Sequence, residues 1–388
     1  MNNDSHTEPQ PSLPYWRLSG FYFFYFAVVG TMTPFWGLYL QSLDFSAQQI
    51  GFIGAILMGT RIVAPSIWGW LGDRTGKRLG IVRLGSFLAC LGFLILFWSK
   101  DFVSIALAIA VYSFFWNAVL AQFEVIALGY LGPQPQRYSR IRVWGSVGFI
   151  VVVTGLGVLL DYVAISYLPF IAVIFLICTW LSNHTFREQV LPHQPPRRGD
   201  LWRIVRQPAV LAFLISSCLL QISHGTYYTF YSLYLESLDY SRRSIGLLWA
   251  LGVIAEVLIF MLIPRWFEWL SLRVIMLVTL AVTALRWWLI ATWADSLSVL
   301  LFAQLLHAFS FGASHAVAIE LVRRFFCGPV HGQGQALYSA ASFGVGGALG
   351  ALISGLVWAY SPYLTFMISA VAALMALIVA WRYLHVVR

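Results

Sequence analysis

The chain has 388 residues, of which 60% are hydrophobic and only 10% are charged. Soluble domains carry about 25% charged residues, so this composition excludes an ordinary water-soluble protein. The formal net charge of +9 could point to nucleic acid, but the basic residues are spread along the chain instead of lying on one soluble face, which excludes a nucleic-acid partner.

Twelve apolar stretches follow one another with short polar gaps between them. A helix needs about 20 apolar residues to cross the bilayer core, and each stretch reaches roughly that length. A transmembrane β-barrel would show strict alternation of apolar and polar residues, which is absent from runs such as LGSFLACLGFLILFW. We therefore predict an all-α membrane protein in contact with the lipid bilayer. Its predicted spans are residues 16–40, 48–71, 79–99, 102–130, 139–162, 164–183, 209–235, 244–264, 272–294, 297–322, 333–358 and 362–384.

The segment before the first span, residues 1–15, is polar and punctuated by proline. It lacks the basic start and the small-residue cleavage site of a signal peptide. We therefore expect a cytoplasmic tail and a first helix that remains in the membrane.

The longest polar interruption, residues 184–207, follows the sixth span. Its Pro195 and Pro196 block a helix, and the arginines after them cannot enter lipid, so we predict a cytoplasmic linker. This linker separates an N-terminal six-helix bundle, residues 16–183, from a C-terminal six-helix bundle with a short cytoplasmic tail, residues 208–388.

Basic residues are concentrated in alternate gaps between the spans. The gaps after the even-numbered spans hold most of them, whereas the opposite gaps hold mainly Lys100, Arg242 and Arg243. By the positive-inside rule, both termini of this multi-pass protein lie in the cytoplasm. We expect the membrane to be the bacterial inner membrane.

Several classes of site are missing from the sequence. The four cysteines stand singly, with no spacing typical of a metal site or a disulfide framework. There is no HExxH, no GxSxG and no glycine-rich phosphate loop of the Walker type. We expect no metal, no cofactor and no enzymatic activity.

The gap between the second and third spans reads GWLGDRTGKR, residues 69–78. Glycines permit backbone angles that other residues resist, an aspartate can cap a helix, and the cations hold the loop in the cytosol. The segment resembles the loop signature of the major facilitator superfamily, although it could be a plain basic turn. The resemblance implies the major facilitator fold, with a substrate site between the halves. It also implies a conformational gate formed by Gly69, Gly72, Asp73, Arg74, Gly76, Lys77 and Arg78.

A second resemblance narrows the family. RYSRIRVWGSVGF, from Arg137 to Phe149, looks like the corresponding stretch of the 3-phenylpropionate transporter family, which is related to lactose permease. LLQISHGTYYTFY in the seventh span, GLLWALGVIAEVLIF in the eighth and QLLHAFSFGASH in the tenth also resemble that family. The likeness thus covers both halves of the chain.

The lactose permease pattern of an acid in the fourth helix and an arginine eighteen residues later matches Glu124 and Arg142. We expect these two residues to meet across the fourth and fifth helices and to bind substrate. The same resemblance assigns Glu256, Arg286 and His307 to the permease's acid, arginine and histidine in helices eight to ten. Where the permease has a proton-carrying carboxylate three residues after the histidine, this chain has Ser310, so the identity of the proton carrier stays open.

These ionisable residues lie within predicted membrane spans, where a charge is costly. An ionisable residue at the centre of a membrane helix costs about 2.5–3.5 kcal/mol on insertion scales, which favours a functional use. Structural ion pairs between helices are the alternative explanation, and a histidine such as His224 or His307 could simply form an interhelical hydrogen bond. We expect substrate binding by Glu124, Arg142, Arg61, His224, Glu256 and Arg286. We expect proton coupling by Glu256, His307 and Glu124.

Together these features predict a monomeric secondary transporter that imports a small organic substrate with a proton. The family resemblance favours an aromatic carboxylate such as 3-phenylpropionate, with the intramembrane arginines as partners of the anion. A neutral sugar or a nucleoside is the alternative substrate. A membrane sensor that does not transport is a further alternative on the same fold.

Overall fold

The computed structural model describes residues 13–132, 137–187 and 200–385. Most of the predicted N-terminal tail 1–15, the central part of the predicted linker 184–207, including Pro195 and Pro196, and the last three residues of the chain lie outside this part.

Within the described residues, twelve helical segments are long and apolar enough to cross a membrane, as predicted. Their ends differ from the predicted ends by a few residues. The first six are α1 (Tyr15–Gln41), α2 (Ala47–Thr75), α3 with η1 (Arg78–Phe97), α4 (Phe102–Leu131), α5 (Tyr138–Leu160), and η3, α6 and η4 together (Ile165–Thr185). The other six are α8 (Pro208–Ser237), α9 (Arg242–Trp269), α10 (Leu272–Trp293), α11, η5 and α12 together (Leu297–Phe325), α13, η7 and α14 together (His331–Trp358), and α15 (Pro362–Tyr383). A short helix that the sequence did not predict, α7 (Asp200–Val205), precedes α8.

Short polar residues fix where several helices begin. The Ser46 and Gln49 side chains form a reciprocal capping box at the start of α2, which satisfies amide groups that the helix leaves unpaired. Asp101 accepts a hydrogen bond from the Ser104 amide at 3.0 Å at the start of α4. Gly76 ends α2 with φ of 67°, a left-handed conformation that glycine adopts at little steric cost.

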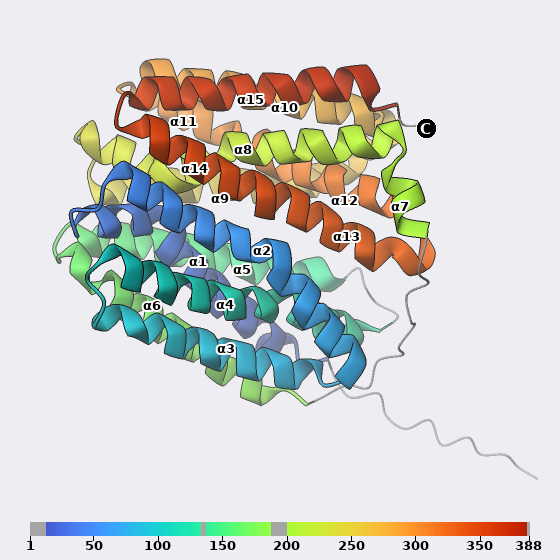
Figure 1. Cartoon of the computed structure of the whole chain (residues 1–388), viewed down its shortest axis with the longest axis horizontal. Coiled ribbons are helices and arrows are strands. Elements are labelled where there is room, and N and C mark those ends of the chain that lie inside the picture. The colour runs from blue at the N-terminus through green and yellow to red at the C-terminus, as the bar shows by residue number, and fades with distance from the viewer. Residues whose placement is uncertain (1–12, 133–136, 188–199, 386–388) are drawn as a thin grey trace, which may run out of the picture.

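The twelve spans form two halves of six helices each, with α1–α6 in one and α8–α15 in the other. In Figure 1 the halves lie one above the other with their helices roughly horizontal, and α1, α2 and α5 lie next to α9 and α14. The described C-terminal residues and α7 are at the same end of the molecule. This is the major facilitator arrangement that the sequence predicts.

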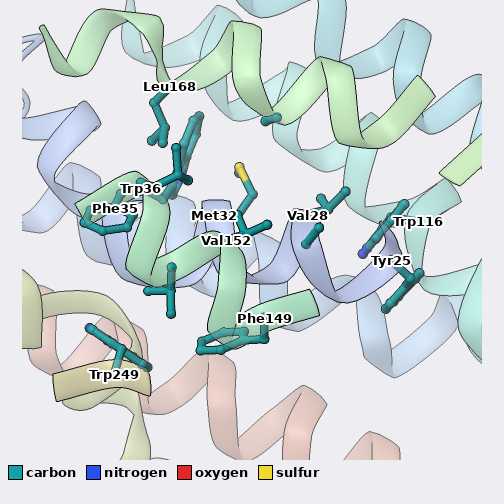
Figure 2. Close-up of a cluster of buried hydrophobic side chains, with 14 of the residues drawn as sticks. Tyr25, Val28, Met32, Phe35, Trp36, Trp116, Phe149, Val152, Leu168 and Trp249 are labelled. Atoms are coloured by element: carbon teal, nitrogen blue, oxygen red, sulfur yellow. The ribbon is translucent and has the colours of Figure 1, made fainter. Parts of the chain in front are cut away.

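One of the apolar clusters is shared between the two halves. One large cluster runs from buried residues of α1, α4 and α5 into α8 and α9, and it includes Tyr227 and Trp249 of the C-terminal half. Figure 2 shows part of this cluster, with Phe149 and Val152 of α5 above Trp249 of α9. A second cluster, from Val205 to Leu384, contains residues of the C-terminal half alone. This second cluster therefore does not join the halves.

Close backbone contacts mark the end at which the halves meet, which we call the sealed end and define by Asp161 after α5 and Arg242 at the start of α9. The amide of Arg242 donates to Asp161 Oδ1 at 2.9 Å, and its side chain donates to the Leu160 carbonyl at 3.1 Å. A Cβ atom placed on Gly246 would lie 2.5 Å from the Val153 carbonyl oxygen, so only glycine fits there. Between residues that the structure describes, every hydrogen bond joining the two halves lies at the sealed end.

The tenth and eleventh spans are not uniform α-helices, contrary to the simple helices predicted from hydropathy. The tenth contains the π-helical segment η5 (Ala308–Ala313) between α11 (Leu297–Leu305) and α12 (Ser314–Phe325). The eleventh contains η7 (Ala340–Gly346) between α13 (His331–Ser339) and α14 (Gly347–Trp358). Hydropathy reports burial and length but not hydrogen-bond register, so it cannot reveal such segments. π-Helical turns occur frequently at functional sites.

Candidate functional site

Arg286 of α10 is the centre of a polar network in the C-terminal half. Its side chain is fully buried. The guanidinium donates to the Ala303 carbonyl at 2.9 Å, to Gln304 Oε1 at 2.8 Å and to Ser310 Oγ at 3.0 Å, and it lies 2.8 Å from His307 Nδ1. It also lies over the rings of Tyr227 and Trp287, 4.4 Å from each centroid. A buried charge is tolerated only when its donors are satisfied, and these contacts do so without a carboxylate.

The hydrogen bonds of His307 determine where its proton lies. A guanidinium can only donate, so His307 Nδ1 must accept from Arg286. The other ring nitrogen, Nε2, then carries the hydrogen and faces Glu256 Oε1 at 2.5 Å. The geometry thus assigns a neutral His307 that donates to a carboxyl oxygen of Glu256. It brings together Glu256, Arg286 and His307, the three residues that the resemblance groups in this half.

Ser310 and Gln304 complete the same network. Ser310 lies in η5 and accepts from Arg286 at the place where the resemblance implies a carboxylate. Gln304 links Arg286 to Tyr231, because its amide donates to the Tyr231 hydroxyl at 3.0 Å. Sequence analysis did not single out Gln304 or Tyr231. The signal available was the position of Gln304 one helical turn before His307.

His224 of α8 lies close to this network but is not bonded to it. Its side chain is fully buried, and Nδ1 is 2.8 Å from the Leu220 carbonyl, to which it donates. Its Nε2 has no hydrogen-bond partner among the described residues. The ring packs edge-on against Trp287, with centroids 5.0 Å apart.

In the N-terminal half, Glu124 is held by a tyrosine. The Tyr138 hydroxyl of α5 donates to Glu124 Oε1 of α4 at 3.1 Å and accepts from the Tyr22 hydroxyl of α1 at 3.4 Å. The expected ion pair between Glu124 and Arg142 does not form in this structure. The eighteen-residue spacing places both residues on facing helices, but Tyr138, one turn before Arg142, takes the carboxylate. Sequence analysis noted this tyrosine only as part of the family-like stretch and did not assign Tyr138 to the site.

Arg142 instead stacks on aromatic rings. Its guanidinium carbon lies 4.1 Å from the Phe26 centroid and 5.5 Å from the Tyr22 centroid. Cation–π contacts of this kind stabilise a cation without neutralising it. Arg142 is half-buried, and no ion pair within the described structure uses it.

Charged and polar groups of the two halves come within electrostatic range of one another. Arg142 lies within electrostatic range of Glu256 and His315, and Arg61 of α2 lies within that range of Tyr228. None of these pairs makes a direct hydrogen bond in the described structure. The structure thus brings the predicted residues of both halves to one region, as two groups that do not bond to each other.

The GWLGDRTGKR segment is more helical than expected. Gly69, Gly72, Asp73 and Arg74 belong to the last turns of α2, and only Gly76 and Lys77 form the turn to α3. Gly72 is helical, contrary to its expected role in the loop conformation. A Cβ there would lie 2.6 Å from Gln122 Oε1, so close packing explains it.

Arg78 is the residue through which this segment ties three helices together. It forms an ion pair with Asp73 and donates to Gln122 Oε1 of α4 at 2.6 Å. Arg74 stacks over the ring of Trp70, 5.4 Å from its centroid. These contacts link α2, α3 and α4 within the N-terminal half.

The sequence matches the model of the MFS_1 like family over residues 15–368, which includes every residue of the site described above. The chain belongs to the MFS_1 like family. This protein is therefore a major facilitator transporter and not an enzyme, and it spans the membrane many times.

Two curated relatives share nearly the whole length of this MFS_1 like protein. A probable 3-phenylpropionic acid transporter of Escherichia coli (strain K12) is 28% identical over 372 residues, which cover 92% of this chain and 94% of the relative. The maltose permease of Geobacillus stearothermophilus is 23% identical over 365 residues, which cover 92% of each chain.

Solved structures of other transporters have the same fold. A mutant of the nucleoside transporter NupG superposes with a TM-score of 0.85 at 17% identity, covering 95% of this chain and 98% of that chain. A bacterial homologue of the iron transporter ferroportin, in an inward-facing state, gives a TM-score of 0.74 at 16% identity, covering 95% and 98%. At these identities the likeness concerns the fold of this MFS_1 like protein alone.

Proposed function

We propose that this protein is a proton symporter that imports a small aromatic monocarboxylate. The observation that carries the proposal is Arg142, a half-buried cation that stacks on Phe26, lies within electrostatic range of Glu124 and Glu256, and makes no hydrogen bond to a carboxylate in the described structure. An arginine fork can bind a carboxylate through two parallel hydrogen bonds, whereas lysine offers only a point charge.

The charges between the halves favour an anion. Three arginines, Arg61, Arg142 and Arg286, accompany two carboxylates, Glu124 and Glu256. With both carboxylates ionised and His307 neutral, this group has one positive charge in excess. Unbalanced charge within a membrane protein is costly, so a substrate with one negative charge would be stabilised there.

The aromatic part of the substrate is supported by two observations. The ring of Phe26 is part-exposed and lies against Arg142, where it could also contact the ring of a bound ligand. In addition, the relative from Escherichia coli is described as a probable 3-phenylpropionic acid transporter.

Glu256 and His307 are the groups that we propose for proton coupling. Their contact holds while Glu256 is ionised, since the carboxylate accepts from His307. A proton on Glu256 would remove the negative charge and weaken the link to the Arg286 network. Proton binding would thereby change the balance between two conformations, as coupling requires.

Transport would proceed by alternating opening of the two ends. The loops at the sealed end carry few basic residues, and those at the other end carry many, so the sealed end faces the periplasm by the positive-inside rule. In this assignment both termini are cytoplasmic, the membrane is the bacterial inner membrane, and the structure has its outer side closed. We propose that the transporter works as a monomer.

The test is uptake into proteoliposomes under an inward proton gradient, screened over aromatic acids, sugars and nucleosides. We expect accumulation of an aromatic monocarboxylate that is lost when the gradient is dissipated. Arg142→Lys should raise the substrate concentration needed for half-maximal uptake by about tenfold or more, because a charge-assisted hydrogen bond contributes about 1.5–3 kcal/mol.

Two results would contradict the proposal. If the double variant Glu124→Gln, Arg142→Gln transports like the unmodified protein, these residues are only structural. If a sugar or a nucleoside is accumulated and aromatic acids are not, the alternative substrate class is correct. The maltose permease relative is the observation that keeps this alternative open.

A further inference from the structure

A surface hollow lies where the end of α15 meets the start of α10, far from the substrate region in the chain. Its volume is about 510 Å³, and its lining residues are Arg273, Trp381, Arg382, Tyr383 and His385. None of the lining residues that the structure describes is acidic, so the hollow favours an anion.

Arg273 has a fixed orientation in the hollow, and some of its hydrogen-bond donors have no partner among the described residues. One terminal nitrogen of its guanidinium donates to the Trp381 carbonyl at 2.6 Å, which sets the orientation of the side chain. Its Nε is buried and has no hydrogen-bond partner within the described part of the chain. The other terminal nitrogen is not buried and makes no hydrogen bond to a described residue, so it can donate to a bound anion.

The residues around the hollow are typical of the membrane interface. Trp381 and Tyr383, at the end of the last span, are 60% and 53% exposed. Such aromatic residues collect at the level of lipid headgroups. The hollow therefore lies at the depth where phosphate groups of lipids are found.

An exposed apolar stripe leads from the hollow into the membrane. Val371, Leu374 and Ile378 lie on the same face of α15 as Trp381, because they follow one another at intervals of three or four residues. On the adjacent helix α10, Val274 and Val278 are exposed as well. A ligand that combines an anionic group with hydrocarbon chains would match both the hollow and the stripe.

We propose that this hollow binds the headgroup of an anionic phospholipid, whose acyl chains lie along α10 and α15. Arg273 and Arg382 bind the phosphate, and His385 lies at the rim. Basic hollows between transmembrane helices are suited to anionic headgroups. The proposal concerns a site separate from the substrate site and does not depend on which substrate is transported.

The test is native mass spectrometry of the delipidated full-length protein mixed with equal amounts of phosphatidylglycerol and phosphatidylethanolamine. We expect the protein to retain phosphatidylglycerol in preference. In Arg273→Gln, Arg382→Gln protein, affinity for this lipid should fall by about fivefold for each arginine removed. Arg382→Gln alone should give the single fivefold loss, and it changes an exposed side chain without touching the Arg273 contact to the backbone.

Arg323→Gln provides the matched control, since it removes an exposed arginine from the same half that is already paired with Glu320 at 2.7 Å. Lipid retention in this control should be unchanged. Equal losses of lipid affinity in the control and in the double variant would show a general effect of charge and would contradict the proposed site. Equal retention of the two lipids by the unmodified protein would also overturn it. Displacement of the lipid by millimolar inorganic phosphate would identify a small-anion site instead.

Discussion

Gly246 offers a direct test of how the two halves close. Alanine at this position would place its Cβ 2.5 Å from the Val153 carbonyl oxygen, whereas carbon–oxygen contacts in proteins are usually about 3.3 Å or longer. The backbones of α5 and α9 would have to separate by roughly 0.8 Å to restore that distance. Because the contact joins the two halves, we expect the sealed end to open while each half stays intact.

The expected effect follows from the cost of overpacking. Extra methyl groups in well-packed contacts cost about 1–3 kcal/mol. That energy would shift the ratio of sealed to opened molecules by about 5- to 150-fold. Alanine also favours a helix over glycine by about 1 kcal/mol, so weakening of α9 cannot explain an opening.

The assay is the distance between spin labels at Tyr162 and Tyr360, which are 86% and 83% exposed at the sealed end of the two halves. Gly246→Ala should add or enlarge a population with a longer distance. Gly155→Ala is the matched control on α5, because a Cβ there would have no atom within 4 Å. If Gly246→Ala and the unmodified protein give the same distance distribution, close packing does not hold the halves together.

Three further variants test the remaining contacts. Asp161→Asn removes the charge that accepts from the start of α9, and the opened population in the same spin-label assay should rise by about two- to fivefold. Asp73→Asn takes the carboxylate from Arg78, so turnover in uptake assays should slow while substrate affinity stays within about threefold; unchanged turnover would show that the contact is only structural. Glu256→Gln should abolish accumulation driven by a proton gradient but retain exchange of labelled for unlabelled substrate, and accumulation at the normal level would exclude Glu256 as the proton carrier.

The sequence was sufficient to predict the twelve helices because length and hydropathy decide whether a segment can cross a bilayer. Glu256, Arg286 and His307, which the family resemblance assigns to neighbouring helices, lie together in the structure. Which of these residues form hydrogen bonds with each other was not predictable. A spacing of residues along a helix defines a face, but it does not specify which of several polar groups on other helices comes within hydrogen-bonding distance.

The partner of Glu124 illustrates this limit, because it is Tyr138 and not the expected Arg142. Tyr138 and Arg142 are one turn apart on α5, so either side chain can point towards α4. The outcome depends on the position of α1, whose Phe26 offers a ring to the guanidinium. Likewise, Gly72 is conspicuous in the sequence, but only the approach of Gln122 from α4 explains it. Both facts depend on tertiary packing.

Because residue 310 is a serine, it adds no carboxylate that could carry a second proton in this network. Among the groups bonded to Arg286 and His307 in the described structure, Glu256 is the single carboxylate. If Glu256 carries the proton, one proton enters with each substrate molecule. A monocarboxylate and one proton together transfer no net charge, so the transport cycle would be electroneutral. Uptake would then follow the pH difference across the membrane and be indifferent to the membrane potential, and the cell could accumulate substrate without depolarising its membrane.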